Sequence, residues 1–207
     1  MTALAWNDLC IALTADLDLL EVASGRDGLE AASTALLNVA KWSRSAAARR
    51  AILHAAQIFD ILDSSRIRES HIARPDLLLF VSALMPSLYL FVTDFEEVSF
   101  DLPIFELVQK FDWAVVNSEG LVNSTESGRS DALTDGQLRS DSSNAARDFV
   151  RYGGPISFAG ESQQGRGVAA RKVLLKYAHL LDDFAKWDRS RYSQLLKTMS
   201  DFVLKDS

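Results

Sequence analysis

The chain has 207 residues, of which 48% are hydrophobic and 24% are charged, a composition that supports a sizeable core and excludes the disordered class. Its net charge of −6 and its lack of any lysine- and arginine-rich run disfavour direct contact with nucleic acid, because the overall field repels phosphate. Cys10 is the only cysteine, which excludes an intramolecular disulfide framework and zinc sites built on two thiolates. We therefore expect a single domain over residues 1–207 in a reducing compartment.

The N-terminal segment predicts an amphipathic helix that ends near Gly25. Its apolar residues recur at three- and four-residue steps and so share one helical face, with Asp8, Asp16 and Glu21 off that face. The predicted face comprises Trp6, Leu9, Leu13, Leu17 and Leu20. No basic region precedes these residues, so we do not expect a secretory signal.

Two more helices are predicted to follow. The second begins after Gly28 and extends to Trp42, because apolar residues again repeat at the helical period. Either Ser43 or Ser45 can cap the third helix. The buried stripe of the third helix is predicted to comprise Ala51, Ala55, Ile58, Phe59 and Leu62.

Several polar residues of the third helix are expected away from its buried stripe. Arg49, Arg50 and Gln57 should lie outside the stripe. His54 flanks the stripe, as a residue at the boundary between core and solvent would.

The longest apolar stretch extends from Leu77 to Val92. It is shorter than the roughly 18 to 20 residues that a membrane-spanning helix needs, so we expect a buried helix and no membrane contact. Pro75 suits the first turn of this helix, and Pro86 should kink or break it because proline removes one backbone donor. Since the stretch is apolar on all sides, we place it at the centre of the bundle.

A fifth helix is predicted from Asp101 and Pro103, which resemble a cap and a first helical position, to about Trp113. Residues 117–143 are polar and rich in serine, glycine and aspartate, which predicts a long flexible loop. A short helix around residues 145–152 should follow it.

The remaining chain predicts turns and then two strong helices. The glycines and Pro155 of GGPISFAG impose turns on either side of a few extended residues, so strand content should be negligible. The apolar faces of the last two helices are Val173, Leu174, Tyr177, Leu181 and Phe184, and then Tyr192, Leu195, Leu196, Met199, Phe202 and Val203. The expected fold class is all-α: an irregular bundle of about seven helices with one long polar loop.

No pattern in the sequence identifies a reactive centre. Residues 160–167, GESQQGRG, have the glycine spacing of a phosphate loop but lack its lysine and its serine or threonine, so we interpret them as a turn. His54, His71 and His179 lack metal-ligand spacing, and His179 should be solvated. Cys10 is expected to be an inert thiol on an apolar face.

Acidic pairs do not change this conclusion. Asp182-Asp183 and Glu96-Glu97 are neighbours in sequence, and neighbouring side chains on a helix point about 100° apart, so each pair is expected to be solvated. We therefore assign no catalytic, cofactor-binding or metal-binding residue, predict no cofactor, and expect that the chain is not an enzyme.

Four segments together resemble a known family. AARRAILHAAQIFDIL, ARPDLLLFVSALMPSLYLFV, RDFVRYGGPISFAG and KWDRSRYSQLLKTMSDFVL occur in the order and at the spacing of the C-terminal part of the fungal-specific transcription factor regulatory domain. The resemblance is closest to the branch of that family attached to two-cysteine, two-histidine zinc fingers. It covers roughly residue 43 to the end and depends on apolar and small residues rather than on a catalytic signature.

The resemblance implies an all-helical regulatory region that takes part in transcription regulation in the nucleus, with the cytoplasm as the alternative location. The DNA-binding and zinc-binding module of the family lies N-terminal to this region, and this chain has neither its cysteines nor room for it. We expect a fragment, a truncated paralogue or an incomplete gene model, with protein partners or self-association. Self-association is expected if Leu77–Val92 stays partly exposed.

The alternative function is a stand-alone helical domain that senses a small molecule or binds another protein. A helical bundle can hold an apolar pocket between its helices, and Phe80, Tyr89, Phe91 and Phe105 are the aromatic residues expected to line one.

Overall fold

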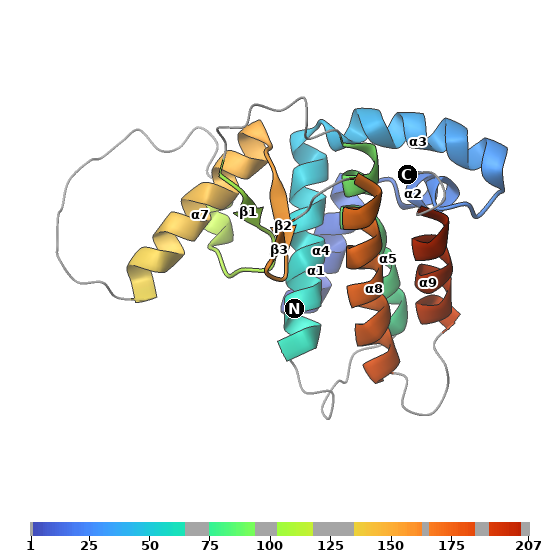
Figure 1. Ribbon diagram of the computed structural model, residues 1–207. Coiled ribbons are helices and arrows are strands. Elements are labelled where there is room, and N and C mark those ends of the chain that lie inside the picture. The colour runs from blue at the N-terminus through green and yellow to red at the C-terminus, as the bar shows by residue number, and fades with distance from the viewer. Residues whose placement is uncertain are drawn as a thin grey trace.

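The computed structural model describes residues 2–64, 75–93, 103–117, 135–162, 166–184 and 191–203. These residues form nine helices and one three-stranded sheet, which confirms the all-α class (Figure 1). The helices are α1 (Ala3–Thr14), α2 (Leu17–Ala23), α3 (Leu29–Ser43), α4 (Ala46–Ser64), α5 (Pro75–Val92), α6 (Trp113–Val116), α7 (Asp135–Tyr152), α8 (Arg166–Phe184) and α9 (Arg191–Val203). The strands are β1 (Phe105–Glu106), β2 (Ile156–Phe158) and β3 (Glu161–Ser162).

Helix α5 is the centre of the bundle, as its apolar sequence predicts. It contacts α2, α3, α4, α8 and α9, and its residues from Leu79 to Leu90 are all buried. Pro86 lies inside α5 and does not end it, because neighbouring helices hold the segment on several sides. The chain buries residues 79–90 of this stretch and leaves Leu77, Leu78, Phe91 and Val92 half-buried, so the expected self-association stays a prediction. No helix of the described segments is long and apolar enough to cross a membrane.

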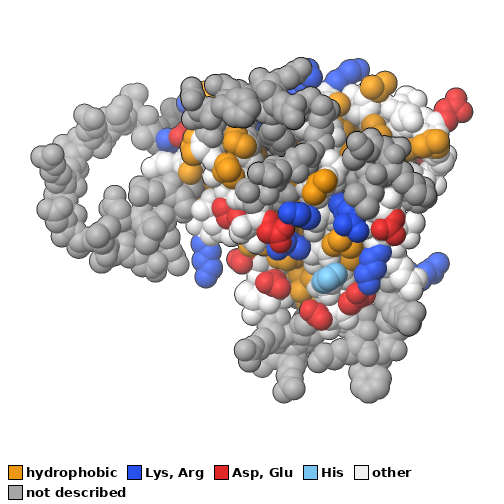
Figure 2. All heavy atoms as spheres, viewed as in Figure 1, with side chains coloured by type: hydrophobic (Ala, Val, Ile, Leu, Met, Phe, Trp, Pro, Cys, Tyr) orange, Lys and Arg blue, Asp and Glu red, His pale blue; other side chains and the backbone are white. Residues whose placement is uncertain are grey.

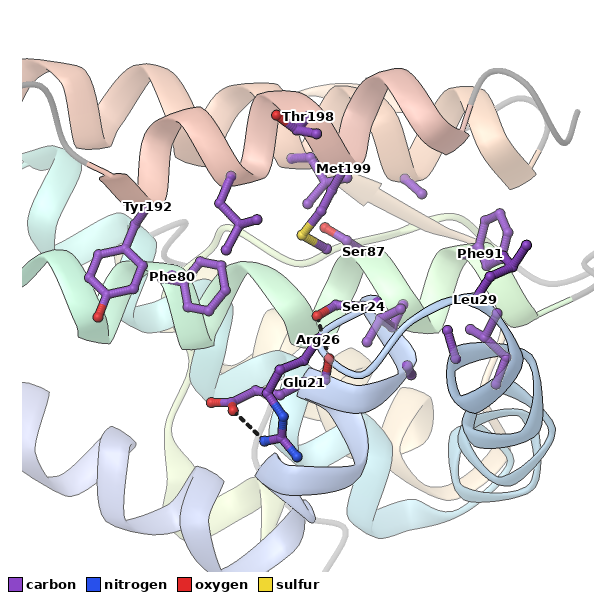
Figure 3. A pocket seen from close by; sticks show the side chains of 18 of the residues that line it. Glu21, Ser24, Arg26, Leu29, Phe80, Ser87, Phe91, Tyr192, Thr198 and Met199 are labelled. Carbon is purple, nitrogen blue, oxygen red and sulfur yellow. Dashed lines mark hydrogen bonds and ion pairs between the residues drawn. The ribbon is translucent and has the colours of Figure 1, made fainter.

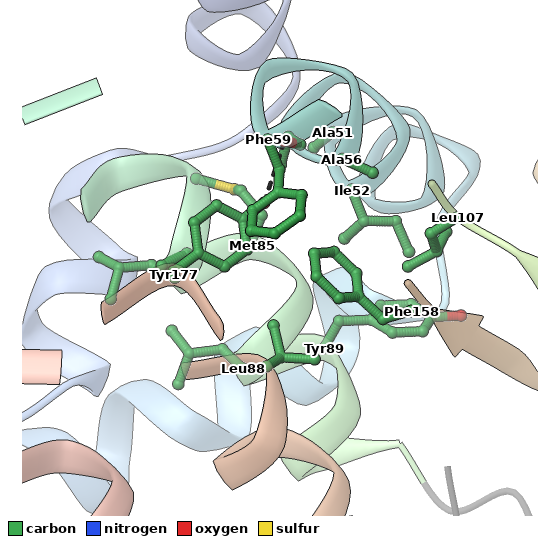
Figure 4. Close-up of a cluster of buried hydrophobic side chains, with 14 of the residues drawn as sticks. Ala51, Ile52, Ala56, Phe59, Met85, Leu88, Tyr89, Leu107, Phe158 and Tyr177 are labelled. Atoms are coloured by element: carbon green, nitrogen blue, oxygen red, sulfur yellow. Dashed lines mark hydrogen bonds between the residues drawn. The ribbon is translucent and has the colours of Figure 1, made fainter. Parts of the chain in front are cut away.

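Aromatic side chains from three elements meet in the core (Figure 4). Phe59 of α4 lies edge-on to Phe158 of β2 and to Tyr177 of α8, with ring centroids 5.0 and 4.9 Å apart. The Tyr177 hydroxyl donates a hydrogen bond to the Ala55 carbonyl at 3.0 Å, so the fully buried tyrosine has a partner for its polar atom. These contacts join α4, α8 and the small sheet.

The N-terminal prediction is wrong in two respects. The chain forms two helices instead of one, because the Asp16 side chain accepts a hydrogen bond from the Leu19 amide at 3.1 Å and begins α2. Helix α1 packs on α4 through its other face, where Leu4, Asn7 and Ile11 are buried. The predicted face of α1 is exposed: Trp6, Leu9 and Leu13 are 44%, 45% and 76% accessible.

Helix α4 begins as predicted and buries its predicted stripe. The Ser45 side chain caps it by accepting a hydrogen bond from the Ala48 amide at 3.1 Å. Arg49, however, is buried, contrary to the prediction. Its guanidinium donates to the Val150 carbonyl at 2.8 Å and the Arg151 carbonyl at 3.3 Å, at the C-terminal end of α7. Burial lowers the pKa of Arg49, while the free carbonyls of that helix end favour a cation there.

The predicted fifth helix is also wrong. Phe105 and Glu106 form β1, which pairs in parallel with β2, and helix resumes only at Trp113. The Glu106 carboxylate explains this choice, because it accepts hydrogen bonds from Val108, Ser157, Ala159 and Gly160 at 2.8 to 3.0 Å. These donors come mostly from 51 to 54 residues away. Asp101 lies outside the described residues.

The described residues between Gly153 and α9 follow their prediction closely, while residues 163–165 of the predicted turn at 160–167 lie outside the described segments. Strand β2 pairs with β3 in antiparallel register, and Ala159 and Gly160 form the turn between them. The two predicted closing helices are confirmed as α8 and α9. Helix α7 begins at Asp135, so the expected loop at residues 117–143 is helical over 135–143, and residues 118–134 lie outside the described segments.

Candidate ligand-binding pocket

A pocket of about 790 Å³ lies between the α2–α3 turn and helices α3, α5, α8 and α9 (Figure 3). Its lining is mostly apolar, with polar residues concentrated at the α2–α3 turn. The apolar lining includes Leu29, Leu36, Leu77, Phe80, Leu88, Phe91, Leu174, Tyr192, Leu195 and Met199. This volume falls in the range of about 300 to 1,000 Å³ that small-molecule sites occupy.

Local sequence builds the pocket in a simple way. Gly25 and Gly28 have φ angles of +100° and +93°, which L side chains rarely adopt, and they let the chain turn from α2 into α3. Helix α9 presents Tyr192, Leu195 and Met199 on one face, at the three- and four-residue steps of an amphipathic helix. The turn and α9 face each other across α5 in the close-up view (Figure 3).

An aromatic pair forms one end of the pocket. The rings of Phe80 and Tyr192 stack with centroids 4.9 Å apart and an angle of 30° between their planes. Phe80 comes from α5 and Tyr192 from α9, so the contact holds α9 against the central helix. Asp182 of α8 reinforces this position, because it accepts hydrogen bonds from Ser193 and Lys197 of α9, both at 2.6 Å.

Ser87 is the polar residue that α5 contributes to the lining of the pocket. It lies on α5 and is 2% exposed, and its hydroxyl has no hydrogen-bond partner in the described part of the chain. Ser82, one and a half turns earlier, is equally buried but donates to the Leu78 carbonyl at 2.7 Å. Buried hydroxyls nearly always have a partner, so the unpartnered Ser87 hydroxyl at the pocket wall is an exception that requires an explanation.

The rim of the pocket carries an ion cluster at the α2–α3 turn. The Arg26 guanidinium contacts Asp18 at 2.7 Å, Glu21 at 2.8 Å and Asp27 at 3.2 Å. Hydrogen bonds to Asp27, Asp18 and Glu21 raise the pKa of Arg26 well above its ordinary value. Three carboxylates therefore surround one cation, and two negative charges at the rim are left unbalanced within the cluster.

The predicted pocket aromatics are only partly brought together. Phe80 and Phe91 line the pocket, whereas Tyr89 and Phe105 do not. Tyr89 is buried in the core, and burial raises the pKa of its phenol to about 12. Phe105 stacks on Phe149 of α7 with centroids 4.8 Å apart. Ser87 was not predicted as a pocket residue, although a serine inside a largely apolar helix such as Leu77–Val92 is itself a signal.

His54 is buried instead of lying at the boundary of the core. Its Nδ1 lies 2.7 Å from the Asn7 side-chain oxygen, and its ring stacks on Trp113 with centroids 3.8 Å apart. Asn7 uses its amide nitrogen to donate to the Ala3 carbonyl, so His54 Nδ1 carries the proton and donates to Asn7. Burial, together with the nearby charge of Arg50, lowers the pKa of His54 to about 4. This histidine is a structural link between α1, α4 and α6.

The other candidate residues do not form a reactive site. His179 is exposed, as predicted, and His71 and the Glu96-Glu97 pair lie outside the described residues. Cys10 is half-buried, and burial raises the pKa of its thiol. Among the described residues, no cluster of three histidine, cysteine or acidic side chains could hold a metal ion.

Side chains of both charges lie on the surface of the bundle. Acidic and basic side chains intermingle on the face shown in Figure 2. Glu161, for example, lies between Lys172 and Lys176, with nitrogen to oxygen distances of 3.4 and 3.1 Å.

Comparison with known proteins adds no assignment to these observations. No protein-family model matches the chain. A search of curated proteins and a search of solved structures also find no significant match.

Proposed function

We propose that this chain is a regulatory domain that binds a small, mostly apolar molecule in the pocket between the α2–α3 turn and α9, without catalysing a reaction on it. The observation that carries the proposal is the Ser87 hydroxyl, which is buried and unpartnered among the described residues at the wall of this pocket. A pocket lined by apolar side chains with one inward polar group is typical of sites that hold a ligand in a fixed orientation.

Energetics favour an occupied pocket over an empty one. Binding of an apolar ligand removes the lining from water, which lowers the free energy of the complex by about 25 cal/mol per Å² of apolar area buried. A ligand oxygen or nitrogen that pairs with Ser87 would also remove the desolvation penalty of an unsatisfied buried hydroxyl, roughly 1 to 3 kcal/mol. The free protein has neither the buried apolar area nor the hydrogen bond to Ser87. A ligand that provides both should therefore stabilise the folded chain.

Matched variants on α3 test this proposal. Leu36 lines the pocket, and Leu37 is 67% exposed on the adjacent position. Leu36→Trp fills the pocket and should weaken ligand binding by about tenfold or more, while Leu37→Trp adds the same side chain outside it and should leave binding unchanged. The measurement is a thermal-shift screen of apolar metabolites, followed by calorimetric titration of each hit. If no apolar compound raises the melting temperature, or if both variants lose binding equally, the proposal is wrong.

The family resemblance implies a role in transcription regulation. On that basis we propose that this chain acts in the nucleus as part of transcription regulation. Protein contact in that setting is supported by the exposed face of α1, where Trp6, Leu9 and Leu13 lie uncovered by the described chain. Fusion of the chain to an unrelated DNA-binding domain should change the output of a reporter gene. Replacing Leu9 and Leu13 with glutamine should reduce that change, and an inactive fusion that is well expressed and nuclear would contradict this setting.

A further inference from the structure

We propose that the ligand of this pocket is a cationic amphiphile: an apolar body with a protonated amine or similar cation at the end that lies by the α2–α3 turn. The proposal rests on the proposed function, since it names the class of molecule that the same pocket takes. The apolar lining, the unpartnered Ser87 hydroxyl and the charge of the rim each contribute a separate part of the argument.

The rim distinguishes between ligands of different charge. Glu21 and Arg26 are the charged residues among those that line the pocket. Arg26 is already engaged by three carboxylates at 2.7 to 3.2 Å, so a ligand carboxylate or phosphate would have to compete with them for its donors. An incoming cation instead meets the unbalanced negative charge of the cluster.

Additional acidic residues extend the negative charge of the Arg26 cluster beyond the rim of the pocket. A second, more open hollow of about 660 Å³ on the same pair of helices is lined by Asp16, Asp18, Asp27 and Glu30. Asp18 and Asp27 line this second hollow and also contact Arg26, which lines the first. These carboxylates add to the negative charge of Glu21 around the α2–α3 turn, and this charge favours a cation over an anion at the mouth of the apolar pocket.

The polar groups also match the shape of an amphiphile. The rim cluster is partly exposed, with Arg26 at 41% and Glu21 at 36% side-chain accessibility, so a ligand cation there keeps contact with water. Ser87 lies deeper, beside Met199 in the close-up view, and can pair with an oxygen or nitrogen in the body of the ligand (Figure 3). An apolar body between these two positions contacts residues such as Leu36, Leu88 and Phe91.

The test is calorimetric titration of the intact chain with decylamine, 1-decanol and decanoate at neutral pH, each below its aggregation concentration. These probes share one apolar chain and differ in head-group charge. We expect decylamine to bind about three- to tenfold more tightly than 1-decanol and decanoate to bind more weakly than either, because partly exposed ion pairs contribute only modest free energy. The preference should shrink in 0.5 M salt.

Variants at the rim sharpen the result. Glu21→Gln should lower the ratio of amine to acid affinity, and Arg26→Gln should raise it, because the first removes a negative charge and the second a positive one. Asp148→Asn makes the same charge change as Glu21→Gln at an exposed position of α7, on the other side of the molecule, and should leave the ratio unchanged (Figure 1). Equal binding of all three probes, or tighter binding of decanoate, would overturn the cationic class and leave the proposed function standing. Binding of none of them, together with a failed screen of apolar metabolites, would contradict the proposed function itself.

Discussion

Phe80 and Tyr192 stack across the junction of α5 and α9, with ring centroids 4.9 Å apart. Phe80 is buried and Tyr192 half-buried, and both line the pocket. The contact therefore links the stability of α9 to the integrity of the proposed binding site. Stacked aromatic pairs contribute about 0.5 to 1.5 kcal/mol beyond the area they bury.

Tyr192→Ala should lower the free energy of unfolding by about 1 to 3 kcal/mol, because it removes both the stacked ring and its buried area. It should also weaken binding of any pocket ligand. Tyr152→Ala is the control, since Tyr152 is 66% exposed on α7 and should change stability by less than about 0.5 kcal/mol. Urea denaturation measures both variants, and equal losses would show that the Phe80–Tyr192 contact is unimportant.

Ser87→Ala should stabilise the free protein, by about 1 kcal/mol, because it removes a buried hydroxyl that has no partner among the described residues. The same variant should weaken binding of ligands that can hydrogen-bond to Ser87. Ser82→Ala is the matched control on the same helix, and it should destabilise the protein by about 1 kcal/mol because Ser82 donates to Leu78 at 2.7 Å. Urea unfolding curves of the two variants show whether their changes in the free energy of unfolding have opposite signs. Destabilisation by both variants would contradict the role given to Ser87.

His54 should make the fold sensitive to mild acid. Its pKa in the folded state is about 4, below the ordinary value of 6.5, so the unfolded chain takes up the proton first as pH falls. The contribution of neutral His54 to the free energy of unfolding is fully present above pH 6.5. It is lost as the pH falls from 6.5 to 4, with a total loss of roughly 3 kcal/mol.

His54→Gln should remove this part of the pH dependence while keeping a donor for Asn7, and should be less stable than the parent at neutral pH because the stacking on Trp113 is lost. His179→Gln, at an exposed position, should retain the full dependence. Denaturation curves at several pH values between 4 and 7 give the comparison. If the parent and His54→Gln lose stability in parallel, His54 does not cause the effect.

Glu106→Gln should destabilise the corner formed by the three short strands. One carboxylate oxygen accepts from the Val108 and Ala159 amides and the other from Ser157 and the Gly160 amide. A glutamine can offer only one oxygen, so two donors would face its NH₂ group, at a cost of about 2 to 4 kcal/mol. Glu161→Gln, at a 44% exposed position, should cost less than about 1 kcal/mol. Similar costs for the two variants would show that the four hydrogen bonds contribute little.

Helical periodicity correctly predicted the helices that pack against the core through one face and the helix that is surrounded by others. The stripe of Ile58 and Leu62, the largely apolar α5 from Leu79 to Leu90 and the face of Leu174 and Tyr177 are buried as expected. Each pattern depends on residues three and four apart, which are neighbours within one helix. The all-α class followed from these patterns.

The errors occurred where residues distant in sequence decide the local structure. Arg49 is buried because α7 offers its terminal carbonyls more than 100 residues later in the chain. Glu106 forms a strand because most hydrogen-bond donors to its carboxylate, those of Ser157, Ala159 and Gly160, come from 51 to 54 residues later in the chain. In the N-terminal segment two apolar stripes compete, and the one containing Ile11 packs on α4 while the one containing Leu13 remains exposed.

The pocket could be predicted only in part for the same reason. Phe80 and Phe91 are aromatic residues of the central helix, which made them reasonable candidates. Their neighbours in the pocket come from the α2–α3 turn and from α9, and no local pattern places Arg26 close to Met199. Three-dimensional packing creates both the cavity and the contrast between Ser82 and Ser87.

The most direct test of the proposed binding site uses the two methionines of the described residues, Met85 and Met199. Met199 lines the pocket, whereas Met85 is fully buried in the core and does not line it. With ¹³C-labelled methionine methyl groups, addition of decylamine or 1-decanol should shift the Met199 resonance in a saturable manner and leave the Met85 resonance in place. Shifts of neither methyl group by any apolar probe, or equal shifts of both, would contradict the conclusion that the space between the α2–α3 turn and α9 is a ligand-binding site.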